Sequence, residues 1–381
     1  MNQRAKAAIV SIFATVALIV GGCSSSGNSS ESTAGGGAGG SGSGDTSANV
    51  EAAKKLIADA QQRPRDLGYN VPVGKPIPTG KTIDYIAAST EVSVAEANVF
   101  MQAGSVLGWT VKIIHTDGTP QQTQNAWVQA LREKPDGIAF AGTPPSQIQQ
   151  YLNQASSMKI PVASVGVTNP NGSLASGNGI GYNIATNNKA AVWAAYLTAD
   201  SNGDANAVFI GLPAYPIVTA DLNQLKSLLS TDCPGCKLDV LNLALTDLGP
   251  KTPTLIVSYL RAHPHVKYVV LAADSAMEPG LPAALAAAGL KGVTITGEGP
   301  SLATLQDVIA GKQASSIYYP IYEFAYGMMD YFARIIAGVS PQKPYEAPAW
   351  LMVKDNIPST SNYFPEVADL KQIFAKMWGK A

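Results

Sequence analysis

Two acidic residues, Asp274 and Glu298, each stand two positions beyond a short apolar run. The runs, residues 266–272 and 293–296, are rich in β-branched side chains and too short for helices, which is typical of buried parallel strands. Ligands of open α/β sheets bind beyond the carboxyl ends of the strands. The spacing therefore predicts that both carboxylates face one cleft, where they can hold a ligand or serve as a general acid and base.

Each acid also has a plainer interpretation. Asp274 can cap the helix that should follow it, and Glu298 can be a solvated loop acid. The enzymatic interpretation pairs the two carboxylates in a secreted glycosidase. No Gly-x-Ser-x-Gly or HExxH motif supports another kind of hydrolase. The acids thus favour binding, with the glycosidase as an alternative.

The pair Cys233 and Cys236, in the sequence CPGC, allows a redox motif, half of a metal site or a disulfide. There is no second cysteine pair, and the histidines do not follow zinc-site spacing. For an exported chain we predict a structural disulfide between the two cysteines, with no metal and no cofactor.

The N-terminus carries an export pattern. Arg4 and Lys6 precede an apolar stretch at residues 7–20, and Val20-Gly21-Gly22-Cys23 is similar to a bacterial lipobox. The resemblance implies that residues 1–22 are a signal peptide, that cleavage precedes Cys23, and that Cys23 is lipidated. A plain secretory signal is the alternative. In both cases we expect the chain to be exported. With the lipid anchor, we expect it to be held at the extracytoplasmic face of the bacterial cell membrane.

Residues 23–47 are rich in Gly and Ser and are predicted to form a flexible tether behind the lipidated cysteine. Within the proline-rich connector that follows, residues 74–82 imitate a phosphate-binding loop, but Lys75 replaces its first glycine, so we expect a linker. The formal net charge of −1 gives no basic surface for nucleic acid.

From residue 81 onward, short apolar runs alternate with amphipathic stretches. Repeated βα units of this kind predict parallel sheets covered by helices on both faces, an α/β fold. The predicted strands are residues 83–88, 110–114, 137–141, 161–165, 207–211, 238–243, 266–272, 293–296, 314–319 and 350–353. The predicted helices are residues 48–63, 93–107, 120–132, 146–157, 188–199, 216–229, 252–262, one from Ser275 or Glu278 to Gly289, 301–310, 322–336 and 367–378. Ser93 and Glu96 have the spacing of a capping box at the start of one helix.

Four turns resemble those of the type I periplasmic binding proteins, the ribose and galactose binder group. They are KPDGI at 134–138, HPHV at 263–266, ADSAM at 273–277 and TGEG at 296–299. The resemblance covers roughly residues 80–355. It implies two doubly wound, Rossmann-like lobes joined by a three-segment hinge near residues 183, 319 and 347. It also implies a monomer that presents a small molecule to the permease of an ABC importer.

The expected domain organisation follows from these boundaries. Residues 48–80 form an N-terminal helix and connector. Lobe I comprises residues 81–183 and 319–346, lobe II comprises residues 184–318 and 347–358, and residues 359–381 hold a C-terminal helix.

Matching strand-end loops to the family gives a set of ligand-binding candidates. They are Thr90, Glu91, Thr143, Gly166, Tyr215, Thr219, Asp274, Glu298, Tyr318 and Tyr319. Tyr318 and Tyr319 alternate along a predicted strand, so only one of them can face the cleft. The aromatic pair and the arginines that relatives place in these loops are missing.

A pocket without arginine lacks the usual bidentate partner of a carboxylate or phosphate ligand. We therefore expect a neutral, sugar-like or polyol ligand, delivered by this lipoprotein to an ABC permease. Cationic and partly aromatic compounds also fit a pocket of this kind. A ligand sensor that signals to a membrane receptor is the alternative within the same fold.

Overall fold

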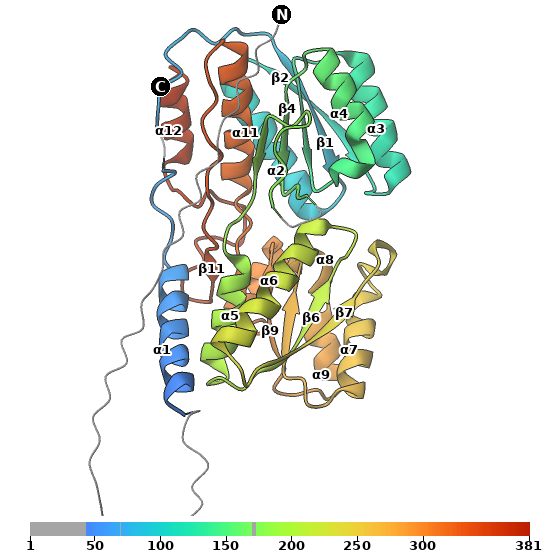
Figure 1. Ribbon diagram of the computed structural model, residues 1–381, viewed down its shortest axis with the longest axis vertical. Coiled ribbons are helices and arrows are strands. Elements are labelled where there is room, and N and C mark those ends of the chain that lie inside the picture. The colour runs from blue at the N-terminus through green and yellow to red at the C-terminus, as the bar shows by residue number, and fades with distance from the viewer. Residues whose placement is uncertain (1–42, 69, 170–172) are drawn as a thin grey trace, which may run out of the picture. The chain divides into compact units, whose positions relative to one another are not determined.

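The computed structural model describes residues 43–381, except residues 69 and 170–172, and its strands form two separate sheets (Figure 1). The first sheet is entirely parallel, in the order β2-β1-β3-β4-β5. Its strands are β1 (Thr82–Ala88), β2 (Thr110–Thr116), β3 (Gly137–Ala141), β4 (Val162–Val165) and β5 (Tyr182–Ile184). We call this sheet and its helices lobe I.

The second sheet, with its helices, forms lobe II and has the order β11-β10-β9-β8-β6-β7. Only its edge strand β11 runs antiparallel to its neighbour. The strands are β6 (Asn206–Gly211), β7 (Lys237–Asn242), β8 (Tyr268–Leu271), β9 (Thr294–Glu298), β10 (Ser315–Ile317) and β11 (Leu351–Met352). The predicted α/β fold with parallel-sheet lobes is confirmed.

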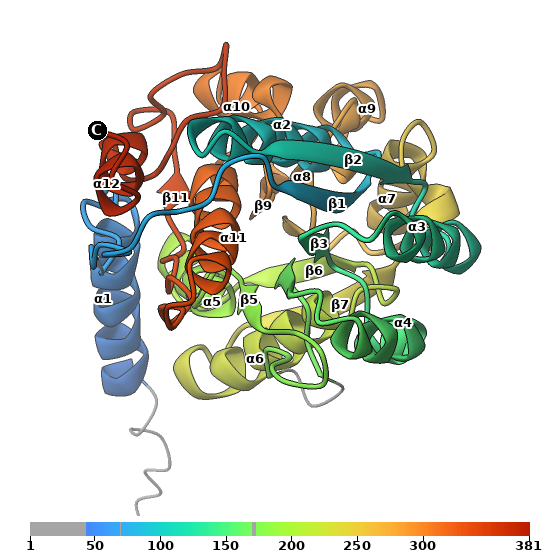
Figure 2. The same cartoon turned by 90° about the horizontal axis from the view of Figure 1, so that it is seen from above.

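Helices cover both faces of the lobe I sheet (Figure 2). Along β1, Ile83, Tyr85 and Ala87 belong to the core shared with α2 and α11, whereas Ile86 belongs to the core beneath α3 and α4. Because both faces are buried, apolar residues follow one another along the strand, interrupted by Asp84, which is buried as well. The helices are α2 (Glu91–Val106), α3 (Pro120–Glu133), α4 (Pro145–Ser157), α11 (Ile321–Ile336) and α12 (Leu370–Met377).

Lobe II is covered in the same way, and α1 packs on its helix α5 (Figure 1). Its helices are α5 (Lys189–Asp200), α6 (Pro216–Asp232), α7 (Thr252–Ala262), α8 (Asp274–Met277), α9 (Leu281–Ala287) and α10 (Leu302–Ile309), with a short 3-10 turn at Leu245–Asp247. The predicted disulfide is present: Cys233 and Cys236 are joined where α6 gives way to β7.

The chain passes between the lobes at residues 185–188, 318–320 and 337–350. Two of these passages lie side by side, since Thr186 forms a parallel bridge with Ala347 and the Asn187 amide donates to the Ala347 carbonyl at 2.8 Å. These passages lie close to the crossing points that the family resemblance implied.

Two further segments extend along both lobes. The N-terminal connector, residues 61–81, leaves α1 on lobe II and places Leu67, Val73 and Ile77 in the core of lobe I. The C-terminal segment, residues 353–369, leads from β11 in lobe II to α12 on α11. They fasten to each other through Arg63, whose guanidinium donates to the carbonyls of Pro365 and Glu366 at 2.8 Å each.

Three local predictions were wrong, two of them about where helices begin or end and one about the tether. The helix expected to run to Gly289 is broken into α8 and α9, because Pro279 interrupts the backbone and Gly280 adopts a left-handed φ of 82°. The capping box is absent: Thr90 caps α2 instead, accepting from the Ser93 amide, and Glu96 is a buried interior residue.

The third wrong prediction concerns the N-terminal side of the described chain. Helix α1 (Ser43–Ala60) begins inside residues 23–47, which were predicted to form a flexible tether. The predicted signal peptide and Cys23 lie outside the described residues. Over the part of the chain that the structure describes, no helix combines the length and apolar character needed to cross a bilayer.

Helix α12 completes the core of lobe I, and Phe374 is its fully buried anchor, with 0% of the residue exposed. Phe374→Ala should lower the free energy of unfolding by about 3 to 5 kcal/mol, because the substitution removes buried apolar area and leaves a cavity. Urea denaturation measures the difference. Val128→Ala, at a position 54% exposed on α3, is the control and should cost less than about 0.5 kcal/mol. Equal effects would mean that α12 does not stabilise lobe I.

Glu96 is 1% exposed and accepts a hydrogen bond from the Tyr85 hydroxyl at 2.9 Å. Burial raises the pKa of Glu96 to about 7, against the opposing effect of hydrogen bonds from Tyr85 and Tyr319. The folded protein thus keeps this proton to a higher pH than the unfolded chain does. The contribution of Glu96 to the free energy of unfolding therefore falls as pH rises from about 4.5 to about 7.

Glu96→Gln keeps an acceptor for Tyr85 but carries no titrating proton. The variant should gain stability relative to the wild type as pH rises from 5 to 8, by on the order of 3 kcal/mol. Urea unfolding at several pH values tests this, with Glu51→Gln on the exposed face of α1 as a control that should track the wild type. If the stability of Glu96→Gln and of the wild type changed with pH in the same way, Glu96 would not have the raised pKa that we assign to it.

Candidate ligand-binding cleft

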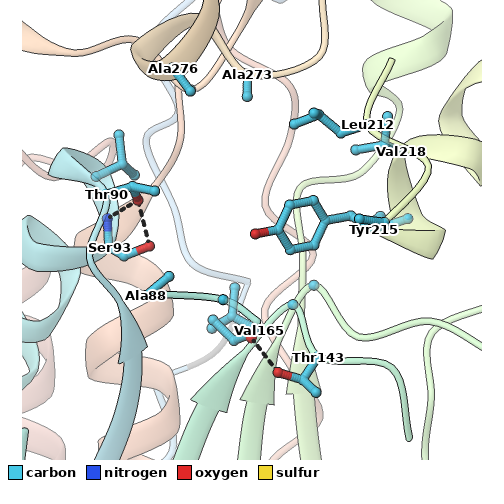
Figure 3. Close-up of a pocket in the computed structure, with 18 of the residues that line it drawn as sticks. Ala88, Thr90, Ser93, Thr143, Val165, Leu212, Tyr215, Val218, Ala273 and Ala276 are labelled. Atoms are coloured by element: carbon cyan, nitrogen blue, oxygen red, sulfur yellow. Dashed lines mark hydrogen bonds between the residues drawn. The ribbon is translucent and has the colours of Figure 1, made fainter. Parts of the chain in front are cut away.

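A cavity of about 330 Å³ lies where the carboxyl ends of the two sheets meet (Figure 3). Each strand from β1 to β4 and from β6 to β9 contributes its last residue or the loop that follows it. This is the place where open α/β sheets bind ligands. The remaining walls come from the passages between the lobes, at Ala185, Thr186 and Tyr319, and from the helices that follow them, at Lys189 and Phe324.

The wall contributed by lobe I carries short hydroxyl and amide side chains, interspersed with apolar residues such as Ile86, Val92 and Val165. Helix N-termini position several of them: the Thr90 hydroxyl caps α2 and donates to the Ser93 hydroxyl at 2.9 Å. Thr143, in the loop after β3, donates weakly to the Ala141 carbonyl at 3.4 Å. The polar residues of this wall are Thr90, Ser93, Thr116, Thr123, Thr143 and Gln147.

The wall contributed by lobe II is predominantly aliphatic. It comes from the loops after β6, β7 and β8 and from the first turn of α6. Its aliphatic residues are Leu212, Ala214, Ile217, Val218, Leu245, Leu248, Ala272, Ala273 and Ala276. The polar residues on this side are Tyr215, Ser275 and Glu298.

Tyr215 extends from the N-cap of α6 into the cavity, and its hydroxyl points toward the wall of lobe I (Figure 3). The ring lies against the backbone of Gly142, where an added Cβ would stand 3.4 Å from it. Gly142 has a left-handed φ of 66°, so a larger residue there would strain the loop and crowd the ring. Burial raises the pKa of Tyr215, so its hydroxyl keeps its proton and can donate.

A buried ion triad forms the base of the cavity. The Lys189 ammonium lies 2.7 Å from a carboxylate oxygen of Asp221 and 2.7 Å from one of Glu298. Burial alone would lower the pKa of Lys189, but the two carboxylates outweigh it and raise the pKa above its ordinary value. The pKa of Glu298 is raised by burial, and Lys189 offsets only part of that effect. The charges that line the cavity therefore satisfy one another.

Six of the sequence-predicted binding residues line the cavity: Thr90, Thr143, Gly166, Tyr215, Glu298 and Tyr319. Four do not: Glu91, Thr219, Asp274 and Tyr318.

Asp274 is fully buried within lobe II instead of facing the cleft. Its carboxylate accepts from Gln313 at 2.8 Å and from the Ser316 hydroxyl, and burial raises its pKa well above the ordinary value. It makes no side-chain cap on α8 either. The pairing of Asp274 with Glu298 in one cleft, on which the glycosidase alternative relied, is therefore not formed at the cavity.

The other three residues are also accounted for by their surroundings. Glu91 accepts hydrogen bonds from the Tyr363 hydroxyl at 3.0 Å and, across to lobe II, from the Leu302 amide at 3.3 Å. Thr219 is exposed on α6. Tyr318 stacks on Phe364 at a ring-centroid distance of 4.6 Å and donates to its carbonyl at 2.7 Å.

Two parts of the site escaped the sequence analysis. Lys189 begins α5 directly after a passage between the lobes, and nothing local marks it as buried, because its partners lie 32 and 109 positions farther along the chain. The sequence analysis missed the aliphatic wall because a leucine or valine that follows a strand is equally typical of the hydrophobic core. Among the described residues, no group of three His, Cys, Asp or Glu side chains is arranged to hold a metal ion.

Replacing Lys189 by an uncharged residue should destabilise the protein. Lys189→Met leaves two buried carboxylates uncompensated and should lower the free energy of unfolding by about 3 to 5 kcal/mol at pH 7. The triple variant Lys189→Met, Asp221→Asn, Glu298→Gln removes all three charges and should recover most of the loss. Lys55→Met, at a side chain 77% exposed, is the matched control and should change little. If Lys189→Met behaves like that control, the triad is not an energetic unit.

Comparison with known proteins agrees with this geometry. The family model of the periplasmic binding protein domain matches residues 84–340. No curated protein matches the sequence. Solved structures do match by fold, each at low sequence identity.

A solute-binding protein of an ABC transporter from Agrobacterium vitis, with bound allitol, shares 20% identity at a TM-score of 0.62 over 78% of this chain and 99% of that one. A sugar ABC transporter protein from Yersinia enterocolitica shares 17% identity at a TM-score of 0.67, covering 80% and 96%. The 5-methylthioribose transporter solute-binding protein from Thermotoga lettingae shares 14% identity at 0.65, covering 80% and 99%.

These likenesses establish the shared fold, and the family model spans most of the chain. With two parallel-sheet lobes, three passages between them and a cavity at the strand ends, the chain belongs to the type I periplasmic binding proteins, the ribose- and galactose-binding-like family of solute-binding proteins.

Proposed function

We propose that this protein captures a small neutral ligand with hydroxyl groups between its lobes and delivers it to the permease of an ABC importer. The observation that carries the proposal is the charge balance of the cavity. Its lining ions, Lys189 and Glu298, are already paired with each other, and Lys189 is also paired with Asp221. An ionic ligand would have to break this triad or remain unpaired in a buried site, and both are costly.

The hydroxyl groups of Thr90, Ser93, Thr143 and Tyr215 are the groups we assign to ligand hydrogen bonding, with Tyr319 and Glu298 at the base and Gly166 giving close backbone approach. Allitol and 5-methylthioribose, bound in two structural neighbours, are neutral and hydroxylated, which supports the same ligand class here.

Capture in this architecture works through closure. A ligand that touches both walls binds the closed arrangement better than the open one and shifts the population toward it. The contact from Glu91 in lobe I to the Leu302 amide in lobe II is made across the two lobes and would form and break with this movement. The permease then distinguishes the closed, loaded form. We place the protein at the extracytoplasmic face of the membrane, held by a lipid on Cys23.

A thermal-shift screen with neutral sugars and polyols, sugar phosphates and carboxylates tests the ligand class. A neutral compound at about 100 times its Kd should add about 2.7 kcal/mol to the free energy of unfolding and raise the melting temperature. Tyr215→Phe should weaken that binding roughly 5- to 10-fold, because it removes one hydroxyl donor from the cavity.

Tyr268→Phe is the control, since it removes a hydroxyl at the start of β8, far along the strand from the cavity end, and should leave the affinity unchanged. Shifts with anionic compounds alone would show that the neutral site is wrong. An equal loss in both tyrosine variants would show that Tyr215 does not contact the ligand.

A further inference from the structure

We propose that the ligand is amphipathic: a neutral molecule with one hydroxylated edge and one apolar face, such as a cyclic alcohol or a glycoside with an apolar substituent. This inference rests on the proposed capture of a neutral ligand in the cleft and narrows its chemistry. It follows from an asymmetry between the two walls of the cavity.

The polar side chains are concentrated on one wall. Lobe I presents hydroxyls and an amide from the N-terminal turns of α2, α3 and α4 and from the ends of β2 and β3. Thr90, Ser93 and Gln147 sit at helix starts, Thr116 ends β2, and Thr143 lies in the loop after β3. A ligand edge facing this wall therefore meets both donors and acceptors.

The opposite wall offers few such partners. Leu212, Leu245 and Leu248 follow β6 and β7, and Ile217 and Val218 lie on the first turn of α6. The carboxylate on this side, Glu298, is held by Lys189 at 2.7 Å. Tyr215 sends its hydroxyl across the cavity toward lobe I and away from this wall (Figure 3).

A sugar with hydroxyls around its whole ring fits this arrangement poorly. Ligand hydroxyls that face the lobe II wall would lose their hydrogen bonds to water without replacement, which is a heavy cost for a buried polar group. Sugar sites commonly meet the apolar C–H face of the ring with an aromatic side chain, but among the described residues of this wall only Tyr215 is aromatic. An extended apolar surface on the ligand would bind this wall favourably, because its burial removes apolar area from water.

Two pairs of neutral probes separate these cases in calorimetric titrations of the protein. Phenyl β-glucoside and methyl β-glucoside carry the same ring hydroxyls, and only the first adds a flat apolar group. The pair cis-1,2-cyclohexanediol and myo-inositol shares a six-membered carbon ring, and the diol keeps one hydroxylated edge. We expect phenyl β-glucoside to bind at least about 10 times more tightly than methyl β-glucoside, and the diol to bind more tightly than the inositol.

Variants of the lobe II wall locate the effect. Val218→Thr adds a hydroxyl with almost no change of shape, and Leu248→Gln adds an amide at a partly exposed position. Each should weaken phenyl β-glucoside binding roughly fivefold or more and leave methyl β-glucoside binding within about twofold. The control is Leu255→Gln on α7, the same substitution at a residue 37% exposed and outside the cavity, which should change neither affinity.

The outcomes are distinct. Tighter binding of methyl β-glucoside and myo-inositol than of their apolar partners would overturn the inference while leaving capture of a neutral ligand intact. Equal losses for both glucosides in the wall variants would also overturn it, because the wall would then not discriminate. Binding of none of the four probes would overturn the neutral-ligand proposal and this inference together.

Discussion

One buried ammonium group organises the base of the cleft. Lys189 is the first residue of α5, directly after a passage between the lobes, Asp221 lies on α6 and Glu298 ends β9, so two ion pairs tie the start of α5 to two other elements of lobe II. A charge in such a place is tolerable only when it is paired, because desolvation would otherwise expel its proton or unfold its surroundings. The same pairing leaves the cavity without a free charge, and the character of the ligand follows from that.

The rest of the site follows from the geometry of parallel sheets. All strands of lobe I, and all but the edge strand of lobe II, point their carboxyl ends toward the same cavity, so the loops after these strands supply much of its lining. Left-handed glycines such as Gly142 and Gly166 let these loops turn sharply without a side chain in the way. Within this shared frame the two lobes differ in composition: lobe I supplies most of the hydroxyl groups, and lobe II supplies most of the large aliphatic side chains.

The layout of the fold could be predicted from the sequence because strands buried on both faces leave a strong local signal, as along β1 and β3. Thr90, Thr143 and Tyr215, which follow β1, β3 and β6, were placed at the cleft by matching those loops to the family that the chain resembles. The burial of Asp274 could not be predicted, since nothing local shows that Gln313 and Ser316, far along the chain, enclose its carboxylate. The break between α8 and α9 was visible in Pro279 and Gly280, but apolar periodicity across them outweighed it in the prediction.

The N-terminal connector (residues 61–81) and the C-terminal segment (residues 353–369) run along both lobes and extend the cooperative folding unit beyond the family domain. The family match ends at residues 84 and 340, yet Leu67, Val73, Phe374 and Trp378, all outside it, are buried in the core of lobe I. The Val73 amide even donates to the Met377 carbonyl, so the two outer pieces close on each other as well as on the lobe. A chain trimmed to residues 84–340 would expose apolar surface that the intact protein covers, and so the boundary of the family match and the thermodynamic boundary of this protein do not coincide.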